Sequence, residues 1–356
     1  MATVTLEELL QELVERNGSD LHILAGSPPR IRIDGKLVNV GADVLDGEDA
    51  QKLVYSILDN EQIARFERDL EIDLSFGISG LGRFRTNVYM QRGTVAAAMR
   101  RVPWEIWKLD DLGLPVKLIK EICDKPKGLV LVTGATGSGK STTLATMIDY
   151  INSTRNGHII TIEDPIEFVH RHKNCLVTQR EVGSDTRGFH NALRSVLRQD
   201  PDIVLIGEMR DKETIETALV LAETGHLTFA TLHTSDCVQT VNRIVDVFPA
   251  YQQQQVRTQL SFVIQAIICQ QLIPHASGRG RVLAAEIMLA TPAIRSLIRD
   301  DKAHQIYSVI QTSGKLGMCT SNQGLAELVR AHKITKDEAL AHSTDPEELK
   351  RLLNIA

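Results

Sequence analysis

The sequence has little aromatic character and no excess of positive charge. Phe, Trp and Tyr make up 4% of the 356 residues, too few for the ring platforms that stack on single-stranded nucleic acids. Lys and Arg number 40 against 45 Asp and Glu, a net charge of −5. This balance argues against binding to nucleic acid or to an anionic membrane through bulk charge. We therefore expect no nucleic-acid partner.

Long hydrophobic runs are also missing. No stretch approaches the ~18 consecutive apolar residues that a membrane-spanning helix needs. The first residues, MATVTLEELLQELVER, lack the basic-then-apolar order of a signal peptide. These observations predict a cytoplasmic protein.

The cysteines are few and scattered, at positions 123, 175, 237, 269 and 319. No two form a CxxC pair, and an odd, dispersed set is not a disulfide framework. The spacing predicts free buried thiols and, by the same reasoning, excludes a structural zinc site. We expect no zinc.

The first part of the chain has the pattern of an α+β domain, residues 1–101. A capping-box start at Thr5 precedes a helical apolar stripe, and short strands are predicted at 21–24 and 30–33, with a hairpin turn at Asp34–Gly35. A second helical stretch is expected around 48–68, followed by three alternating segments that predict an antiparallel meander. Residues 102–115, which contain Pro103, Trp104 and Pro115, have little periodicity and are interpreted as a linker.

From residue 116 to residue 290 the pattern changes to alternating strands and helices. Apolar runs at 128–133, 158–162, 203–206 and 227–232 predict buried strands separated by helices. Such an order is typical of a parallel sheet covered on both faces, and hence of an α/β fold. Residues 291–356 are predicted to be helical.

The segment GATGSGKST, residues 134–142, follows one of these strands and opens a helix. It fits GxxxxGK[ST], in which backbone N–H groups surround phosphates at a positive helix N-terminus. Lys140 can reach the β- and γ-phosphate oxygens, and Ser141 offers a hydroxyl to Mg²⁺. The segment predicts a nucleoside-triphosphate site.

Two acidic segments follow other strands. Glu208 ends the apolar run DIVLIGE and is a candidate Mg²⁺ ligand, directly or through water, or else a charge favoured by a helix N-terminus. Glu163, in TIEDPIE, is placed to accept a proton from an attacking water; the alternative is a solvated acidic loop.

His226 and His233 are seven residues apart, which predicts opposite faces of one strand and excludes a shared metal. His233 suits a γ-phosphate sensor at the strand end; the alternative is a polar strand end without chemistry.

Arg83 and Arg85 are predicted on one strand face, and Arg101 ends the next strand. These arginines either supply charge to a phosphate from outside the P-loop domain or are solvated.

The ordered set GATGSGKST, TIEDPIEF, DPDIVLIGEMRD and TGHLTFATLHT resembles the type II/type IV secretion ATPase superfamily. The segment NGSDLHILAGSPPRIRIDGKL is similar to the start of its pilus-motor branch. Residues 293–300, AIRSLIRD, match the AIRNLIRE motif of retraction motors at six of eight positions, with Ser296 and Asp300 departing. The long N-terminal domain and tetracysteine zinc site of assembly motors are not found here.

The resemblance implies a PAS-like domain at 1–101, a RecA-like P-loop ATPase domain at 116–290 and a helical C-terminal region at 291–356. It implies a homo-hexameric motor that hydrolyses Mg·ATP to retract type IV pilus filaments. The inner-membrane pilus platform protein and, indirectly, pilin would be its partners at the inner-membrane face. The alternative is a pilus assembly or type II secretion motor; a non-hydrolysing scaffold and a nucleic-acid translocase are more distant readings.

The resemblance also assigns roles to residues. Glu163 would activate water, Ser141 and Glu208 would hold Mg²⁺, and His233 would detect the γ-phosphate together with Arg83, Arg85 and Arg101. Residues 293–300 would form a coupling helix in which Arg295 and Arg299 have no carboxylate three or four residues before them. ATP would be bound by Thr136, Gly137, Ser138, Gly139, Lys140, Ser141 and Thr142.

Overall fold

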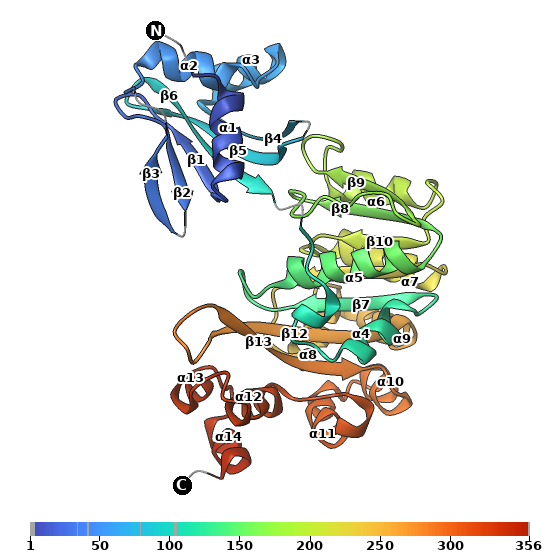
Figure 1. Cartoon of the computed structure of the whole chain (residues 1–356). Coiled ribbons are helices and arrows are strands. Elements are labelled where there is room, and N and C mark those ends of the chain that lie inside the picture. Colours follow the sequence, from blue (N-terminus) through green and yellow to red (C-terminus); the bar gives the residue numbers. More distant parts are fainter. Residues whose placement is uncertain (1–3, 34, 41–42, 79, 103–104, 355–356) are drawn as a thin grey trace. The chain divides into compact units, whose positions relative to one another are not determined.

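A computed structural model describes residues 4–33, 35–40, 43–78, 80–102 and 105–354 of the chain. The chain divides into two compact units, Met1–Glu105 with Glu167–Val169, and Ile106–Ile166 with His170–Ala356 (Figure 1). Each unit contains one sheet, so the fold is α/β. Of the linker expected at 102–115, residues 103–104 lie outside the described residues. Residues 106–115 pack in the second unit, where Leu109, Leu112 and Leu114 are buried.

The first unit is built on an antiparallel sheet of order β3-β2-β1-β6-β5-β4. The predicted meander is confirmed by the pairing of β4 with β5 and of β5 with β6. Strands β2 and β3 also pair, but Asp34 of the turn predicted between them lies outside the described residues. The elements are α1 (Leu6–Glu15), β1 (Asp20–Ile23), β2 (Arg30–Ile33), β3 (Lys36–Asn39), α2 (Gly47–Tyr55), α3 (Asn60–Asp69), β4 (Glu71–Ile78), β5 (Gly82–Gln91) and β6 (Thr94–Val102).

The helical stretch expected at 48–68 is two helices, α2 and α3, so the prediction of one continuous stretch was wrong. Asp59 is the reason for the break. Its side chain accepts the N–H of Gln62, and the side chain of Gln62 accepts the N–H of Asp59. This capping box satisfies donors that a continuous helix would have bonded internally, and it starts a new helix.

The register of β5 and β6 separates the predicted arginine cluster. Arg85 lies opposite Arg100, whereas Arg101 lies opposite Phe84, a fully buried core residue. Because directly opposed residues share a face and neighbours along a strand alternate, Arg83 and Arg85 lie on one face and Arg101 on the other. On the first face Arg100 Nε donates to Asp20 Oδ1 over 2.8 Å. The expected grouping of Arg101 with the β5 arginines was therefore wrong.

The second unit has a sheet of order β13-β12-β7-β11-β10-β8-β9, flanked by helices. The four strands predicted from apolar runs are confirmed as β7, β8, β10 and β11; β9, β12 and β13 were not predicted. Strand β13 runs antiparallel to β12, so the sheet is mixed. The sequence had predicted a parallel sheet. The elements are α4 (Val116–Cys123), β7 (Gly128–Thr133), α5 (Lys140–Thr154), β8 (His158–Glu163), β9 (Leu176–Glu181), α6 (Phe189–Val196), β10 (Ile203–Ile206), α7 (Lys212–Glu223), β11 (Leu227–Leu232), α8 (Cys237–Asp246), α9 (Ala250–Val263), β12 (Ile264–Pro274), β13 (Arg281–Leu289), α10 (Pro292–Arg299), α11 (Ile306–Thr312), α12 (Ser321–Arg330), α13 (Lys336–Ala341) and α14 (Pro346–Leu353).

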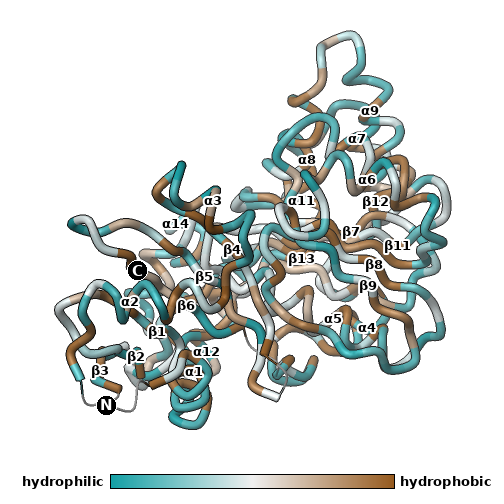
Figure 2. Tube along the Cα trace, turned by 90° about the horizontal axis from the view of Figure 1, so that it is seen from above, coloured by the Kyte–Doolittle hydropathy of each residue, from teal (hydrophilic) through white to brown (hydrophobic). Residues whose placement is uncertain are grey.

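Helices cover both faces of this sheet. Val130 and Val132 of β7 belong to a core shared with α4 and α5, while Leu129 and Leu131 belong to a core shared with α6, α7, α8 and α9. Figure 2 shows the same layering, with the hydrophobic strands between the two groups of helices. A strand buried on both faces favours apolar side chains, which is why β10 is wholly apolar and why only Thr133 interrupts the apolar run of β7, whereas β11 contains the buried Thr228 and Thr231.

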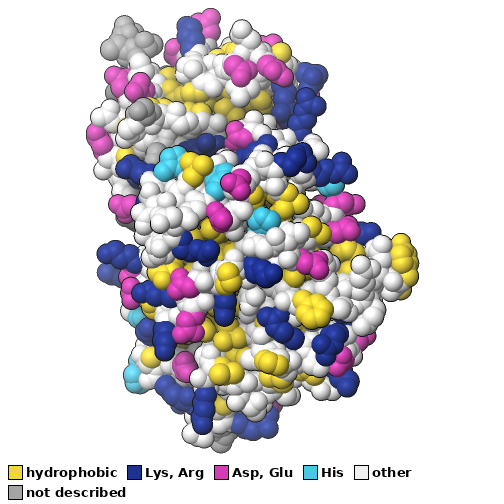
Figure 3. All heavy atoms as spheres, turned by 90° about the vertical axis from the view of Figure 1, so that its right-hand side faces the viewer, with side chains coloured by type: hydrophobic (Ala, Val, Ile, Leu, Met, Phe, Trp, Pro, Cys, Tyr) yellow, Lys and Arg dark blue, Asp and Glu magenta, His cyan; other side chains and the backbone are white. Residues whose placement is uncertain are grey.

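The surface carries both signs of charge. On the face in Figure 3, Lys and Arg side chains stand among Asp and Glu side chains and do not form one continuous patch. Within the described parts of the chain, no helix has the length and apolar character that crossing a lipid bilayer requires.

The C-terminal motif at 293–300 forms α10, capped by Thr291. Ile294 and Ile298 are fully buried, whereas Ala293 is exposed. Both arginines have partners. Arg299 pairs with the adjacent Asp300 at 3.3 Å, and Arg295 Nη1 donates to the carbonyl oxygens of Ser261 and Phe262 over 2.6 and 2.8 Å. These carbonyls belong to the last turn of α9, where helical oxygens have no partner within the helix, so Arg295 joins α10 to α9.

We therefore expect Arg295→Ala to lower the free energy of unfolding by about 1.5–3 kcal/mol, the scale of hydrogen bonds from a charged donor. Arg299→Ala, in the same helix with an exposed ion pair, should cost less than about 1 kcal/mol. Urea denaturation of both variants measures the difference. Equal losses would show that the Arg295 contacts add no stability.

Candidate nucleotide-binding site

The loop between β7 and α5 is shaped by its glycines. Gly134, Gly137 and Gly139 have φ of 138°, 78° and 90°, backbone conformations that other residues rarely adopt. At Gly134 a Cβ atom would also lie 2.3 Å from the carbonyl oxygen of Gln270 on β12. The loop is thus forced into a tight turn that leads directly into α5, whose first-turn N–H groups point at the site that the sequence predicts.

Lys140, the first residue of α5, has a largely buried side chain. Its Nζ donates to the carbonyl oxygens of Gly134 and Ala135 over 2.8 and 3.0 Å, which holds the ammonium inside the loop. Burial lowers the pKa of Lys140, and the negative charge of Glu208 opposes this shift. The lysine and the acidic residue after β10 therefore belong to one electrostatic site. Ser141 is exposed beside Lys140.

The strand order places the predicted polar residues together. Parallel neighbours β7, β11, β10 and β8 end at the same edge, and the P-loop, His233, Glu208 and Glu163 follow or end these strands. At Gly207 a Cβ would lie 3.2 Å from Cα of Glu163 and from the carbonyl oxygen of Ile162. This close approach explains why glycine, and not a carboxylate, stands at the end of β10.

The carboxylate of Glu208, which follows β10, contacts two basic side chains. Arg210 Nη2 lies 2.8 Å from its Oε2, and His233 Nε2 lies 3.3 Å from its Oε1. Burial by itself raises the pKa of Glu208, but Arg210 and His233 outweigh it and keep the pKa below its usual value. Glu208 is thus an ionised carboxylate at neutral pH, and it contacts the histidine that the sequence nominated as sensor.

Glu163, mostly buried at the end of β8, is oriented by its neighbours. Its Oε1 accepts a hydrogen bond from Thr161 Oγ1 over 2.6 Å and one from Gln179 Nε2 over 3.3 Å. Asp164, in contrast, is exposed. The structure therefore singles out Glu163 from the acidic segment as the carboxylate built into the strand edge.

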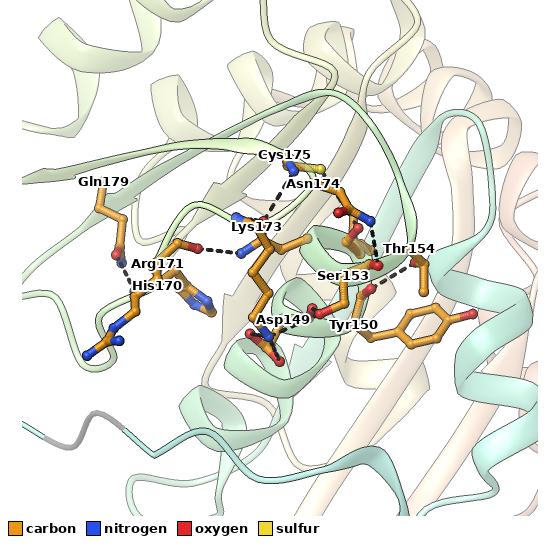
Figure 4. Close-up of polar contacts among 12 residues, drawn as sticks. Asp149, Tyr150, Ser153, Thr154, His170, Arg171, Lys173, Asn174, Cys175 and Gln179 are labelled. Atoms are coloured by element: carbon orange, nitrogen blue, oxygen red, sulfur yellow. Dashed lines mark hydrogen bonds and ion pairs between the residues drawn. The ribbon is translucent and has the colours of Figure 1, made fainter.

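The chain after Glu163 is fastened to the P-loop helix. Asn152, buried near the end of α5, donates Nδ2 to the carbonyl oxygen of Arg171 over 2.7 Å and accepts the N–H of Lys173 at Oδ1 over 3.2 Å. Lys173 also pairs with Asp149 at 2.7 Å, and His170 N–H donates to Gln179 Oε1 (Figure 4). The loop that follows the acidic segment and the helix that follows the P-loop are therefore one connected unit.

The two histidines flank β11 rather than lying within it, so their expected placement on opposite strand faces was wrong. His233 follows the strand at the site. His226 precedes it, and its Nδ1 lies 3.0 Å from the carbonyl oxygen of Leu221 near the end of α7. His226 thus anchors a helix end, away from the strand edge where His233 lies.

Sequence reasoning missed Thr161, Gln179, Asn152 and Arg210. One signal was available for Thr161, because it lies two residues before Glu163 on the same strand and hence on the same face. Gln179 comes from β9, an unpredicted strand, and Asn152 is an ordinary helical residue until the loop folds onto it. No local pattern identifies these two.

A glycine-rich loop after a buried parallel strand, a lysine at the following helix start and an ionised carboxylate on a neighbouring strand define the class of P-loop nucleotide-binding proteins. A family model described as "Type II/IV secretion system protein" matches residues 2–337. The chain belongs to this family, which confirms the resemblance seen in its motifs.

Comparisons with individual proteins show which branch of the family the chain resembles. The chain is 50% identical to the type IV pilus retractation ATPase PilT of Pseudomonas aeruginosa, over 96% of this chain and 99% of that protein. It is 45% identical to a twitching motility protein of Neisseria gonorrhoeae, over 92% and 87% of the two chains. A crystal structure of the pilus retraction motor PilT with bound ADP superposes with a TM-score of 0.92 at 51% identity, covering 98% of this chain and 99% of that one. The prediction of the retraction branch is confirmed.

The pairing of Arg210 with Glu208 predicts a pH effect. With the arginine removed, the pKa of Glu208 rises, so the carboxylate takes up its proton at a higher pH. If Glu208 acts ionised, the acidic side of the pH–rate profile for ATP hydrolysis should move to higher pH in Arg210→Ala. Arg198→Ala, an exposed arginine bonded only to a helix carbonyl, serves as the control. An unmoved acidic limb would contradict the pairing as a determinant of activity.

Proposed function

We propose that this chain is a motor ATPase that hydrolyses ATP to power the retraction of type IV pili. The observation that carries the proposal is the 50% identity to a pilus retractation ATPase over nearly the whole of both chains. An intact P-loop, with Lys140 held in it, and the paired carboxylate Glu208 support ATP as the substrate. The α10 motif, AIRSLIRD, supports the retraction branch over the assembly branch.

In the proposed mechanism the backbone N–H groups of Thr136–Thr142 surround the phosphates, and Lys140 moves from its loop carbonyls to the β/γ oxygens. Ser141 and Glu208 offer a hydroxyl and an ionised carboxylate, the oxygen ligands that Mg²⁺ prefers, and so fit this ion. When bound, Mg²⁺ neutralises charge on the phosphates. Glu163, oriented by Thr161, takes the proton of the attacking water.

His233 is proposed to report the state of the γ-phosphate through Glu208, because the histidine contacts this carboxylate. Arg83 and Arg85 share one face of β5 and are proposed to supply charge to a phosphate bound by another domain or subunit. The same role for Arg101 has weaker support, since that arginine faces the other way.

Mixing Arg85→Ala chains with Lys140→Ala chains should restore some hydrolysis; no recovery at any ratio would refute action between subunits.

The finer architecture is part of the proposal. The first unit would be PAS-like and the core of the second RecA-like, and six chains would form a ring at the cytoplasmic face of the inner membrane. Loss of the γ-phosphate would then move the domains and transmit work to the inner-membrane pilus platform protein, returning pilin to the membrane.

Two variants test the chemistry. Lys140→Ala removes the cation aimed at the β/γ oxygens, so hydrolysis should collapse. Glu163→Gln keeps the shape of the side chain but loses the base, so ATP should still bind while turnover falls ~10²-fold or more. ATP binding and steady-state hydrolysis measure both. Near-normal turnover of Lys140→Ala would refute the P-loop assignment, and lost binding in Glu163→Gln would make this residue a metal ligand instead.

A gene deletion tests the direction of the motor. Without a retraction motor, cells should accumulate surface pili and lose twitching movement, and the wild-type gene but not Lys140→Ala should reverse this. Counting pili by electron microscopy gives the result. Disappearance of pili would instead identify an assembly motor.

A further inference from the structure

Three side chains that the nucleotide site does not use converge inside the second unit. They are Cys237, the first residue of α8, Cys269 of β12 and Glu286 of β13. The two sulfur atoms lie 3.6 Å apart, and one oxygen of Glu286 joins them in a group whose ligand atoms all lie within 4.8 Å of one another. Their exposed fractions are 0%, 3% and 3%.

The strand register builds this cluster. Cys269 lies directly opposite Thr133 of β7 on one side and Glu286 of β13 on the other. Side chains that are opposite in register share a face, so the three stand in one row across adjacent strands, with Cys237 over them from α8. Thr133 Oγ1 donates to Cys269 Sγ over 3.0 Å. The row ends one residue before the P-loop.

Glu286 lacks a basic partner although it is buried. Its two oxygens accept the N–H groups of Cys237 and Ser321, the first residues of α8 and α12, over 2.8 and 3.3 Å. In the part of the chain that the structure describes, the groups that act on Glu286 include no Lys, Arg or His. Buried carboxylates are usually paired with a cation or bound to metal, so a cation would complete this cluster.

We propose that Cys237, Cys269 and Glu286 form a buried structural Zn²⁺ site. Two Zn–S bonds of about 2.3 Å at a tetrahedral angle place their sulfurs about 3.8 Å apart, close to the 3.6 Å seen here. Thiolates exclude Mg²⁺ and Ca²⁺, and the carboxylate oxygen favours zinc over the softer Cu⁺. A water molecule would supply the fourth ligand.

Binding balances in protons and charge. Each thiol loses one proton as its S–H bond breaks and a Zn–S bond forms, so one Zn²⁺ releases two protons and the cluster keeps the same net charge. Zinc affinity should therefore fall as the pH falls.

The site has a structural meaning of its own. Zinc would fix the start of α8, which follows His233, to the strand next to the P-loop, and Glu286 would continue the link to α12. The sequence spacing that argued against zinc considered local pairs only, and these cysteines are 32 residues apart. The proposal does not depend on ATP hydrolysis or on pilus retraction.

Metal analysis of the purified full-length chain is the test. The protein, refolded with Zn²⁺ and freed of loose metal, should hold about one zinc per chain and release two protons on binding. Cys237→Ser/Cys269→Ser should hold none. Cys123→Ser/Cys175→Ser, which alters two other buried cysteines, should keep the zinc and is the matched control. Co²⁺ in place of zinc should give thiolate charge-transfer absorption in the wild-type protein but not in Cys237→Ser/Cys269→Ser.

A second variant distinguishes the loss of a zinc ligand from misfolding of the double variant. Glu286→Gln keeps both thiols and should weaken zinc binding by at least tenfold. Wild-type protein holding no more zinc than the double variant would overturn the proposal. So would a thiol titration in denaturant with chelator that counts three free thiols instead of all five cysteines, because this result would mean a Cys237–Cys269 disulfide.

Discussion

The parallel pairing of β8, β10, β11 and β7 is the constraint on which the rest of the structure depends. In this register Ile206 lies beside Ile162 and Ala230, and Ala230 beside Leu131, so four strand ends arrive at one edge. Each candidate catalytic group of the second unit follows or ends one of these strands. A one-residue slip of any strand would turn its polar end to the opposite face and dismantle the site.

Polar groups at that edge are tolerated because each has a partner. Glu208 lies between Arg210 and His233, and Glu163 accepts hydrogen bonds from Thr161 and Gln179. The same crowding accounts for the Gly-Glu sequence after β10. A Cβ at Gly207 would lie 3.2 Å from backbone atoms at the end of β8, which disfavours a side chain there, and the carboxylate stands one residue later. An unusual motif thus follows from the packing of two strand ends.

The C-terminal helices are tied to the ATPase core by side chains that bind helix ends. Arg295 bonds the carbonyl oxygens that end α9, and Glu286 accepts the N–H groups that begin α8 and α12. Such contacts satisfy groups that every helix leaves without a partner. The retraction-type motif in α10 is therefore part of the folded core and is bonded to the end of α9.

The sequence by itself determined the central strands, the P-loop and the residues at its strand ends, because a doubly covered strand is largely apolar and a phosphate loop must be rich in glycine. Motif order also identified the family and its retraction branch. Tertiary structure alone decided what depends on register and on long-range contacts. It separated Arg101 from Arg85, split the stretch 48–68 at Asp59, and supplied Gln179 and Asn152 as partners of the site. It also gathered Cys237, Cys269 and Glu286. Side chains from separate strands and helices meet only when the sheet is formed, so no local pattern could record their proximity.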